Sequence, residues 1–174
     1  MKNFAKLFCS ALFLALAACQ VQPLYGTFGP GGAPAIGDNL SQVEIAPVGG
    51  RTGIALRNEL IFVLTGGGQA VTNGRYKLAI AMQESATPTQ YEQISGRATS
   101  AMNYTSATYV LTDTATGTKL YQSRSFARST FDQDVNRFAN VRAERDAEDR
   151  AIKVLAQEIR NSLAAYFAQK QQSY

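Results

Sequence analysis

Hydrophobic and polar residues alternate with a period of two through the middle of the chain. In residues 75–85, large apolar residues occupy every second position, which is typical of a strand with one buried face. We expect Thr87-Pro88 to end this strand, because proline lacks the amide hydrogen that a ladder needs. Residues 97–112 and 119–131 are rich in strand-forming residues. The Asp- and Gly-containing segment 113–118 between them predicts an antiparallel hairpin.

A period of 3.6 residues, typical of an amphipathic helix, appears in two other segments. The first follows a short strand predicted within residues 41–49; we expect Thr52 to cap it and the glycine-rich segment 65–69 to end it. The second helix is predicted within residues 136–169. The apolar face of the first carries Leu56, Leu60, Val63 and Leu64. That of the second carries Ile152, Leu155, Ala156, Ile159, Leu163, Tyr166 and Phe167.

Opposite charges lie four residues apart along the polar side of the second helix. This spacing predicts ion pairs on a solvated helix face, and it makes catalytic or metal-binding roles for these carboxylates a weaker interpretation. The predicted pairs are Arg142 with Asp146, Arg145 with Asp149, Asp146 with Arg150, and Asp149 with Lys153.

The order strand, helix, strand, strand, strand, helix predicts an α/β (α+β) two-layer sandwich. We expect a four-stranded, mostly antiparallel mixed sheet with two helices on one face, and small, polar and tyrosyl side chains on the other. The folded domain is assigned to residues 41–170, and residues 171–174 are expected to form a disordered tail.

The N-terminal segment has the layout of a bacterial lipoprotein signal peptide over residues 1–18. Two lysines precede an apolar run of twelve residues, 7–18, which is too short to span a membrane. The sequence Leu16-Ala17-Ala18-Cys19 matches a lipobox, in which lipid is attached to the cysteine sulfur. An ordinary signal peptide that carries Cys19 near its cleavage site is the alternative. Residues 19–40 are predicted to be a lipidated N-terminus and a Gly/Pro-rich tether.

Cleavage before Cys19 would leave this residue as the one cysteine of the mature chain, because Cys9 lies in the removed segment. An internal disulfide is then excluded, and acyl chains on Cys19 would form a stable anchor. The only prosthetic groups expected are therefore covalent diacylglycerol and fatty acyl groups on Cys19. Gln20, in place of aspartate, predicts sorting to the periplasmic side of the outer membrane under the enteric rule.

Composition narrows the classes of function for the mature chain of 174 − 18 = 156 residues, the size of one domain. The chain contains no histidine, which removes the commonest general base and most zinc sites. We therefore expect neither a catalytic residue nor a metal site. The net charge falls from +4 to +4 − 2 = +2 when Lys2 and Lys6 are removed, which argues against nucleic acid as a partner.

Two segments of the sequence resemble the LPS-assembly lipoprotein family LptE. They are "CQVQPLYG" with the tether after it, and "NRFANVRAERDAEDRAIKVLAQEIRNSLAAYFA" near the C-terminus; the resemblance covers nearly the whole chain. Members of this branch often have Gly-Phe where this chain has Val21-Gln22. The resemblance implies the two-helix, four-strand sandwich and a non-enzymatic lipoprotein. It further implies a plug within the lumen of the outer-membrane barrel LptD, where the pair inserts lipopolysaccharide into the outer leaflet.

The resemblance also implies binding of lipopolysaccharide, whose phosphates need cationic partners. The candidates on predicted strands are Lys77, Arg97, Arg124 and Arg128. No family motif singles them out, so solvated strand charges are the alternative for each. Two other classes of function stay open: an auxiliary lipoprotein of an ABC-type phospholipid or lipid transport system, and, more weakly, a carboxylate-based glycan hydrolase.

Overall fold

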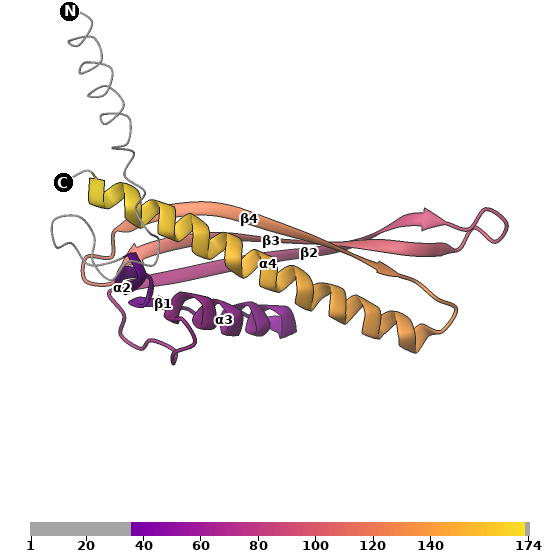
Figure 1. Ribbon diagram of the computed structural model, residues 1–174, viewed down its shortest axis with the longest axis horizontal. Helices are drawn as coiled ribbons and strands as arrows, with labels where there is room; N and C mark the ends of the chain where they lie inside the picture. Colours follow the sequence, from indigo (N-terminus) through magenta and orange to yellow (C-terminus); the bar gives the residue numbers. More distant parts are fainter. Residues whose placement is uncertain (1–35, 173–174) are drawn as a thin grey trace, which may run out of the picture.

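A long sheet covered by helices on one face makes up the described part of the protein, residues 36–172 of a computed structural model (Figure 1). The predicted signal peptide, Cys19 and residues 20–35 lie outside the described residues, as do residues 173–174. The elements are α2 (Ile36–Leu40), β1 (Val43–Ile45), α3 (Gly50–Thr65), β2 (Tyr76–Tyr91), β3 (Ala98–Asp113), β4 (Lys119–Asp132) and α4 (Arg137–Gln172). None of the described helices is long and apolar enough to cross a membrane.

The sheet has the order β1-β2-β3-β4, with β1 parallel to β2 and the other neighbours antiparallel. This confirms the predicted four-stranded mixed sheet. The turn between β3 and β4 is built by Asp113, whose carboxylate accepts the backbone N–H groups of Ala115 and Thr116, and by Gly117, whose φ is +68°. Few residues other than glycine adopt that φ readily, which is why the segment 113–118 forms the hairpin that the sequence predicts.

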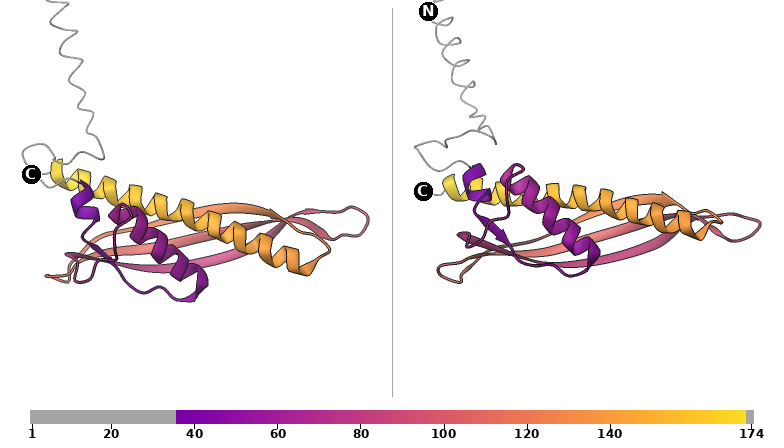
Figure 2. Two further views of the ribbon diagram at one scale, coloured as in Figure 1. Left: turned by 60° about the horizontal axis from the view of Figure 1, so that its bottom comes forward. Right: turned by 90° about the horizontal axis from the view of Figure 1, so that it is seen from below.

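Helices α3 and α4 cover one face of the sheet side by side, as predicted (Figure 2). Gly66 ends α3 in the left-handed conformation, and the Gly67 N–H donates to the oxygen of Phe62 at 2.9 Å. The prediction that Thr52 caps this helix is wrong. The helix begins at Gly50 and its N-cap residue is Gly49, so Thr52 lies inside the first turn.

The folded domain extends beyond the predicted residues 41–170 at both ends. Residues 36–40, assigned to the tether, form α2, because Ile36 and Leu40 are one helical turn apart and are both buried. This third helix packs against α4 and α3. At the other end, α4 continues through residues 171 and 172, which were predicted to belong to a disordered tail.

The prediction that Thr87-Pro88 ends a strand is also wrong, since β2 continues to Tyr91. On the β1 side of β2, the Tyr76 N–H donates to the backbone oxygen of Gln42, and the backbone oxygen of Leu78 accepts from the Ala46 N–H. The even-numbered residues of β2 therefore direct their backbone N–H and C=O groups away from β3. Beyond Leu78, β2 is paired with no described strand on that side. The missing N–H of Pro88 would point to this unpaired edge, so proline is tolerated within β2. The register with β3 shifts directly after Pro88.

The main core lies between the sheet and the two long helices. Its fully buried side chains include Leu60, Leu78, Leu155, Ile159 and Leu163, in agreement with the two predicted apolar helix faces. An aromatic row near the C-terminal end of α4 joins Tyr121, Tyr166 and Phe167, with ring centroids 5.0 and 5.3 Å apart. A smaller cluster of Ala101, Phe131 and Ala147 extends the core beneath the first half of α4.

Candidate functional site

The face of the sheet that turns away from α3 and α4, here called the open face, gathers three of the four predicted cations. Residues directly opposite each other on neighbouring strands share a face. Arg124 lies opposite Thr108, Arg128 opposite Tyr104, and Lys77 opposite Thr112, and all three partners are even-numbered β3 residues. The buried core residues of β3 are odd-numbered, so these cations lie on the face without helices.

A fourth cation, Lys119, joins the open face because it also lies opposite Thr112, across from Lys77. Sequence reasoning missed it, since its place depends on the hairpin register and on an irregularity between Leu111 and Thr112. Among the described strands, two acidic side chains lie on this face: Asp132, at the end of β4, and Glu44 of β1, which lies opposite Lys77. Most of the other positions carry small, hydroxylated or amide side chains, as predicted. Over the described strands, the open face therefore carries four basic and two acidic side chains and is positive overall.

Arg124 is held flat against the centre of the open face. Its Nη2 donates to Ser106 Oγ at 3.0 Å and to Gln83 Oε1 at 3.5 Å, and Ser106 is buried below it. Within the described part of the chain, Nε and Nη1 donate to no protein acceptor. A guanidinium has five N–H donors, so Arg124 keeps donors for an anion while its position is already fixed.

Arg128 lies over an aromatic pair on the same face. Its guanidinium carbon is 5.7 Å from the Tyr104 ring centroid and 5.5 Å from that of Phe126, and the two stacked rings are 5.9 Å apart. Such cation–π contacts orient the guanidinium and leave its N–H edge free. Two hollows flank this cluster. One of about 440 Å³ is lined by Gln83, Glu84, Ser85, Tyr104 and Ser106. One of about 390 Å³ is lined by Arg128, Ser129, Thr130, Arg150 and Val154.

Arg97 was predicted on a strand and is not on one. It precedes β3 in the turn of the β2–β3 hairpin, where its guanidinium lies 3.9 Å from the Glu92 carboxylate. Ser95 also donates to Glu92, so this turn holds its own charges together. The structure therefore separates Arg97 from the other three candidates.

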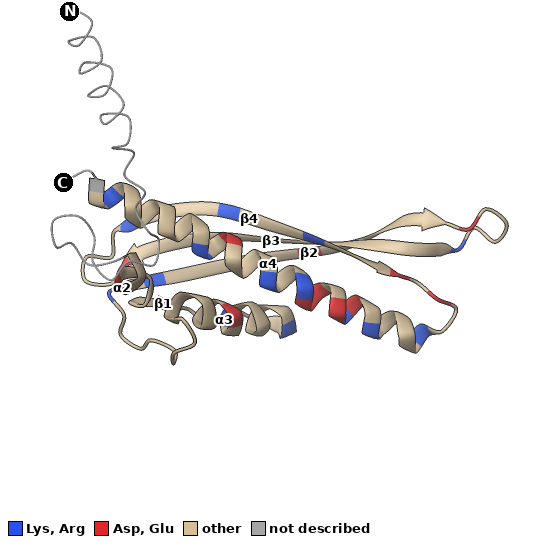
Figure 3. Ribbon diagram, in the orientation of Figure 1, with Lys and Arg blue, Asp and Glu red and all other residues tan. Residues whose placement is uncertain are grey.

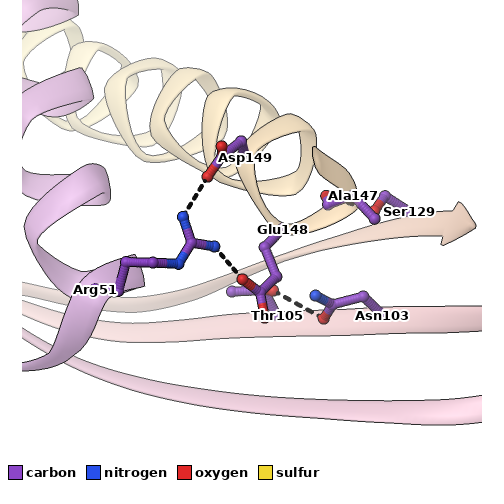
Figure 4. A network of polar contacts seen from close by, with 7 residues as sticks. All are labelled: Arg51, Asn103, Thr105, Ser129, Ala147, Glu148 and Asp149. Atoms are coloured by element: carbon purple, nitrogen blue, oxygen red, sulfur yellow. Dashed lines mark hydrogen bonds and ion pairs between the residues drawn. The ribbon is translucent and has the colours of Figure 1, made fainter. Parts of the chain in front are cut away.

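Several acidic residues lie in the first half of α4 (Figure 3), and two of them fasten α3 to α4. Arg51 of α3 pairs with Glu148 and with Asp149 of α4, the latter at 2.8 Å (Figure 4). The hydrogen bonds that Arg51 donates, first to Asp149 and then to Glu148, raise the pKa of Arg51 above its ordinary value. Beneath them, Thr105 donates to Asn103 at 3.3 Å on the covered face of β3. These contacts are structural, and they leave the open face as the cationic surface.

Among the described residues, no three His, Cys, Asp or Glu side chains are grouped so that they could hold a metal ion. The open face instead presents groups that can bind a ligand. Two oriented guanidinium groups lie on it four residues apart on β4, about 13 Å along the strand, between aromatic rings and hydroxyl groups. This combination suits a large anionic ligand with phosphate groups.

Several solved structures share the fold. A protein of Caulobacter crescentus CB15 described as a lipoprotein has 25% sequence identity, with a TM-score of 0.64 over 76% of this chain and 96% of that one. The minor lipoprotein of Acinetobacter baumannii has 19% identity and a TM-score of 0.55, over 71% of this chain and 88% of that one. The rare lipoprotein B of Shewanella oneidensis has 10% identity and a TM-score of 0.55, over 74% and 96%. A search of curated protein sequences found no significant match.

A family model assigns the chain directly. The model described as "LptE: Lipopolysaccharide-assembly" matches residues 40–163, which run from the end of α2 almost to the end of α4. The match covers more than half of the sequence and includes every described strand. It agrees with the resemblance seen in the C-terminal segment, most of which it includes, and it begins after the N-terminal segment. The chain thus belongs to the LptE family of lipopolysaccharide-assembly proteins.

Proposed function

We propose that this protein is an outer-membrane lipoprotein, anchored through Cys19, that plugs the LptD barrel and assists the insertion of lipopolysaccharide into the outer leaflet. Family membership supports a non-enzymatic role in lipopolysaccharide assembly. Structural neighbours described as lipoproteins support a place in the cell envelope. The barrel partner and the outer-membrane location come from the family resemblance, and they are part of the proposal.

The observation that carries the proposal is the chemistry of the open face. A large outer-membrane barrel has a polar lumen, so a plug needs a surface that stays hydrated and carries few unpaired charges. The open face meets this need with its small and hydroxylated side chains. Arg124 and Arg128 supply oriented donors for lipopolysaccharide phosphates on the same surface.

A binding titration with the double variant Arg124→Glu, Arg128→Glu tests the lipopolysaccharide contact. A hydrogen bond to a charged group contributes about 1.5–3 kcal/mol, so the loss of both arginines should weaken binding by roughly 100-fold or more. The matched control is Arg75→Glu with Lys153→Glu, which reverses two exposed charges that lie outside the strands. Unchanged affinity in a variant with a normal melting curve would assign both arginines to solvated strand charges or to barrel contacts.

Co-purification tests the barrel partner. Affinity-tagged protein, extracted from the envelope in mild detergent, should recover one large β-barrel protein in near-stoichiometric amount. Recovery of an inner-membrane ABC transporter in its place would support the rival class of auxiliary transport lipoproteins. The titration and the co-purification can fail separately, so the ligand and the partner are tested independently.

A further inference from the structure

The first turns of α4 expose an apolar stripe bordered by arginines. Phe138 is 70% exposed, and Val135 and Val141 are also exposed. Arg142 lies over the Phe138 ring, with its guanidinium carbon 6.0 Å from the centroid. A hollow of about 460 Å³ is lined by Phe138, Val141, Arg142 and Arg145, together with Asp146 and Asp149. We call the α4 patch the set Val135, Arg137, Phe138, Val141, Arg142 and Arg145.

The arginines of this patch lack the acidic partners that the sequence predicts for them. Asp146 pairs with Arg150, and Asp149 is taken by Arg51 from α3, so Arg142 and Arg145 form no ion pair with any described residue. Arg137 likewise has none among these residues. The predicted pairs Arg142 with Asp146 and Arg145 with Asp149 are therefore wrong, because Asp146 pairs with Arg150 one turn along α4 and Asp149 pairs with Arg51 of α3.

Two nearby carboxylates outside those pairs make other contacts. Asp134 accepts the backbone N–H groups of Val135 and Asn136 where the chain enters α4. Glu144 lines a separate hollow with Asn103 and Glu148, on the side of α4 that faces the sheet. The three arginines of the α4 patch therefore keep their N–H donors outside any ion pair with a described carboxylate.

Helix stability does not explain this arrangement. The first turn of a helix favours acidic side chains, because the helix dipole is positive there, yet the first turn of α4 has no acid and begins with Arg137. Asn136 caps the helix by accepting the Phe138 N–H at 3.0 Å, so the arginines are not needed as caps. An exposed phenylalanine beside them adds a further unfavourable surface. The same side chains become favourable when an anionic, partly apolar surface covers them.

We propose that the α4 patch binds the headgroup region of an anionic phospholipid bilayer. In this arrangement Phe138 and Val141 enter the boundary between headgroups and acyl chains, and Arg137, Arg142 and Arg145 contact lipid phosphates. Interfacial helices combine these two kinds of side chain in this way. The inference goes beyond the proposed function, since it concerns neither the barrel nor lipopolysaccharide.

The position of the patch favours a bilayer over an acidic protein as the occupant. Helix α4 has 36 residues and is therefore about 54 Å long, and α2 packs near its C-terminal end, at the opposite end from the patch (Figure 1). The chain leads from α2 back to the proposed anchor at Cys19, 36 − 19 = 17 residues away. An anchor keeps the bilayer at high local concentration, so a weak patch at the far end is enough to lay the body along the surface before it enters the barrel.

A tryptophan reporter tests this proposal directly, because the chain contains no tryptophan. Phe138→Trp places a single reporter in the patch, and Phe62→Trp on α3, at a position 61% exposed, is the matched control. The mature chain with its native N-terminus is added to phosphatidylcholine vesicles with or without phosphatidylglycerol. We expect a blue-shifted emission and quenching by brominated lipid for Trp at position 138 only, and only in the anionic vesicles. The readout is local, so anchoring at Cys19 alone, without contact between the patch and the bilayer, does not produce it.

Charge reversal in the Phe138→Trp variant tests whether the arginines cause docking to the anionic vesicles. Arg142→Glu with Arg145→Glu should lower docking by at least about 25-fold, since each basic residue near an anionic surface contributes roughly fivefold. The control Arg75→Glu with Lys153→Glu should keep the shift, and circular dichroism checks folding. If the glutamate variant unfolds, Arg142→Gln with Arg145→Gln replaces it.

Three results would overturn the proposal: no shift in anionic vesicles, an equal shift for the reporter at position 62, or a shift only when lipopolysaccharide is present. The last would assign the patch to the lipopolysaccharide path. Failure here leaves the titration of the open-face arginines unaffected, so the two proposals are separable.

Discussion

Arg160 of α4 donates from Nε to the backbone oxygen of Val63 at 3.1 Å, and this contact fastens α4 to the C-terminal end of α3. Arg51 makes the corresponding contact at the other end of α3, with Glu148 and Asp149. The two contacts are 63 − 51 = 12 residues apart on α3 and 160 − 148 = 12 residues apart on α4. The helices therefore run in the same direction and keep one register for about 18 Å.

The two contacts should differ in their contribution to stability. Arg160 is 9% exposed, and its loss leaves a part-buried carbonyl without its donor, so Arg160→Met should lower the free energy of unfolding by about 1.5–3 kcal/mol. The Arg51 side chain is 44% exposed, and Arg51→Met should cost about 1 kcal/mol or less, with a smaller effect in high salt. Urea denaturation of both variants measures the difference. A larger loss for Arg51→Met would mean that the ion pairs dominate.

Burial along α4 predicts where a cavity destabilises the protein. Leu155 and Leu163 are fully buried, so Leu155→Ala or Leu163→Ala should lower the free energy of unfolding by about 2–5 kcal/mol. Val154 is 52% exposed, one position from Leu155, and Val154→Ala should cost less than about 0.5 kcal/mol. Thermal or urea unfolding compares the three variants. Similar losses at positions 154 and 155 would contradict the orientation of α4.

Alkaline pH should weaken the fold through Tyr166. Burial, and then the neighbouring Tyr76, raise the pKa of the Tyr166 phenol above its ordinary value of 10.0. The folded protein thus keeps this proton to a higher pH than the unfolded chain does. The resulting stability is complete below pH 10.0 and is lost as the pH rises through the folded-state pKa.

Tyr166→Phe should therefore unfold much like the parent near neutral pH and lose less stability than the parent above pH 10.0. Urea midpoints on either side of that pH give the comparison. Tyr91→Phe, which removes an exposed phenol at the end of β2, is the matched control. A parallel decline in the parent and Tyr166→Phe would show that other groups cause the alkaline loss.

Lipid attachment at Cys19 is tested by Cys19→Ala. We expect the variant to remain unprocessed or unacylated, because the cysteine sulfur is the predicted acceptor, and to show an unchanged melting temperature of the folded domain. Mass spectrometry of the parent should find acyl groups on Cys19. A free thiol at Cys19 in the parent would favour an ordinary signal peptide and remove the anchor from the proposed function.

The main elements follow from local patterns, while the departures depend on distant contacts. Apolar spacing placed Leu155 and Leu163 inside because a helix has one period wherever it lies. Pro88 could not be placed in β2 without knowing that β2 is an edge strand beyond Leu78. The partner of Asp149 could not be predicted either, because Arg51 lies 98 residues away in the sequence. Arg51 takes the place of the local partners at helical spacing.

The candidate site was predictable in part for the same reason. The even spacing of Arg124 and Arg128 was enough to place both on one face of a strand. It could not show that Ser106 fixes one guanidinium or that Tyr104 and Phe126 support the other, since these contacts need the pairing of β3 with β4. Arg97 was misplaced because the exact start of β3 is not encoded in a periodic pattern.

The edges of the sheet have a consequence for the protein before it meets any partner. A long unpaired strand edge invites another chain to add to it, and this is a route to aggregation. On the unpaired edge of β2, Pro88 removes one backbone N–H donor that an incoming strand could use. Glu84 adds a charge on the same strand that an incoming strand would have to desolvate. On β4, Arg150 already occupies the carbonyl of Thr130. These three residues should disfavour edge-to-edge pairing between copies of the chain.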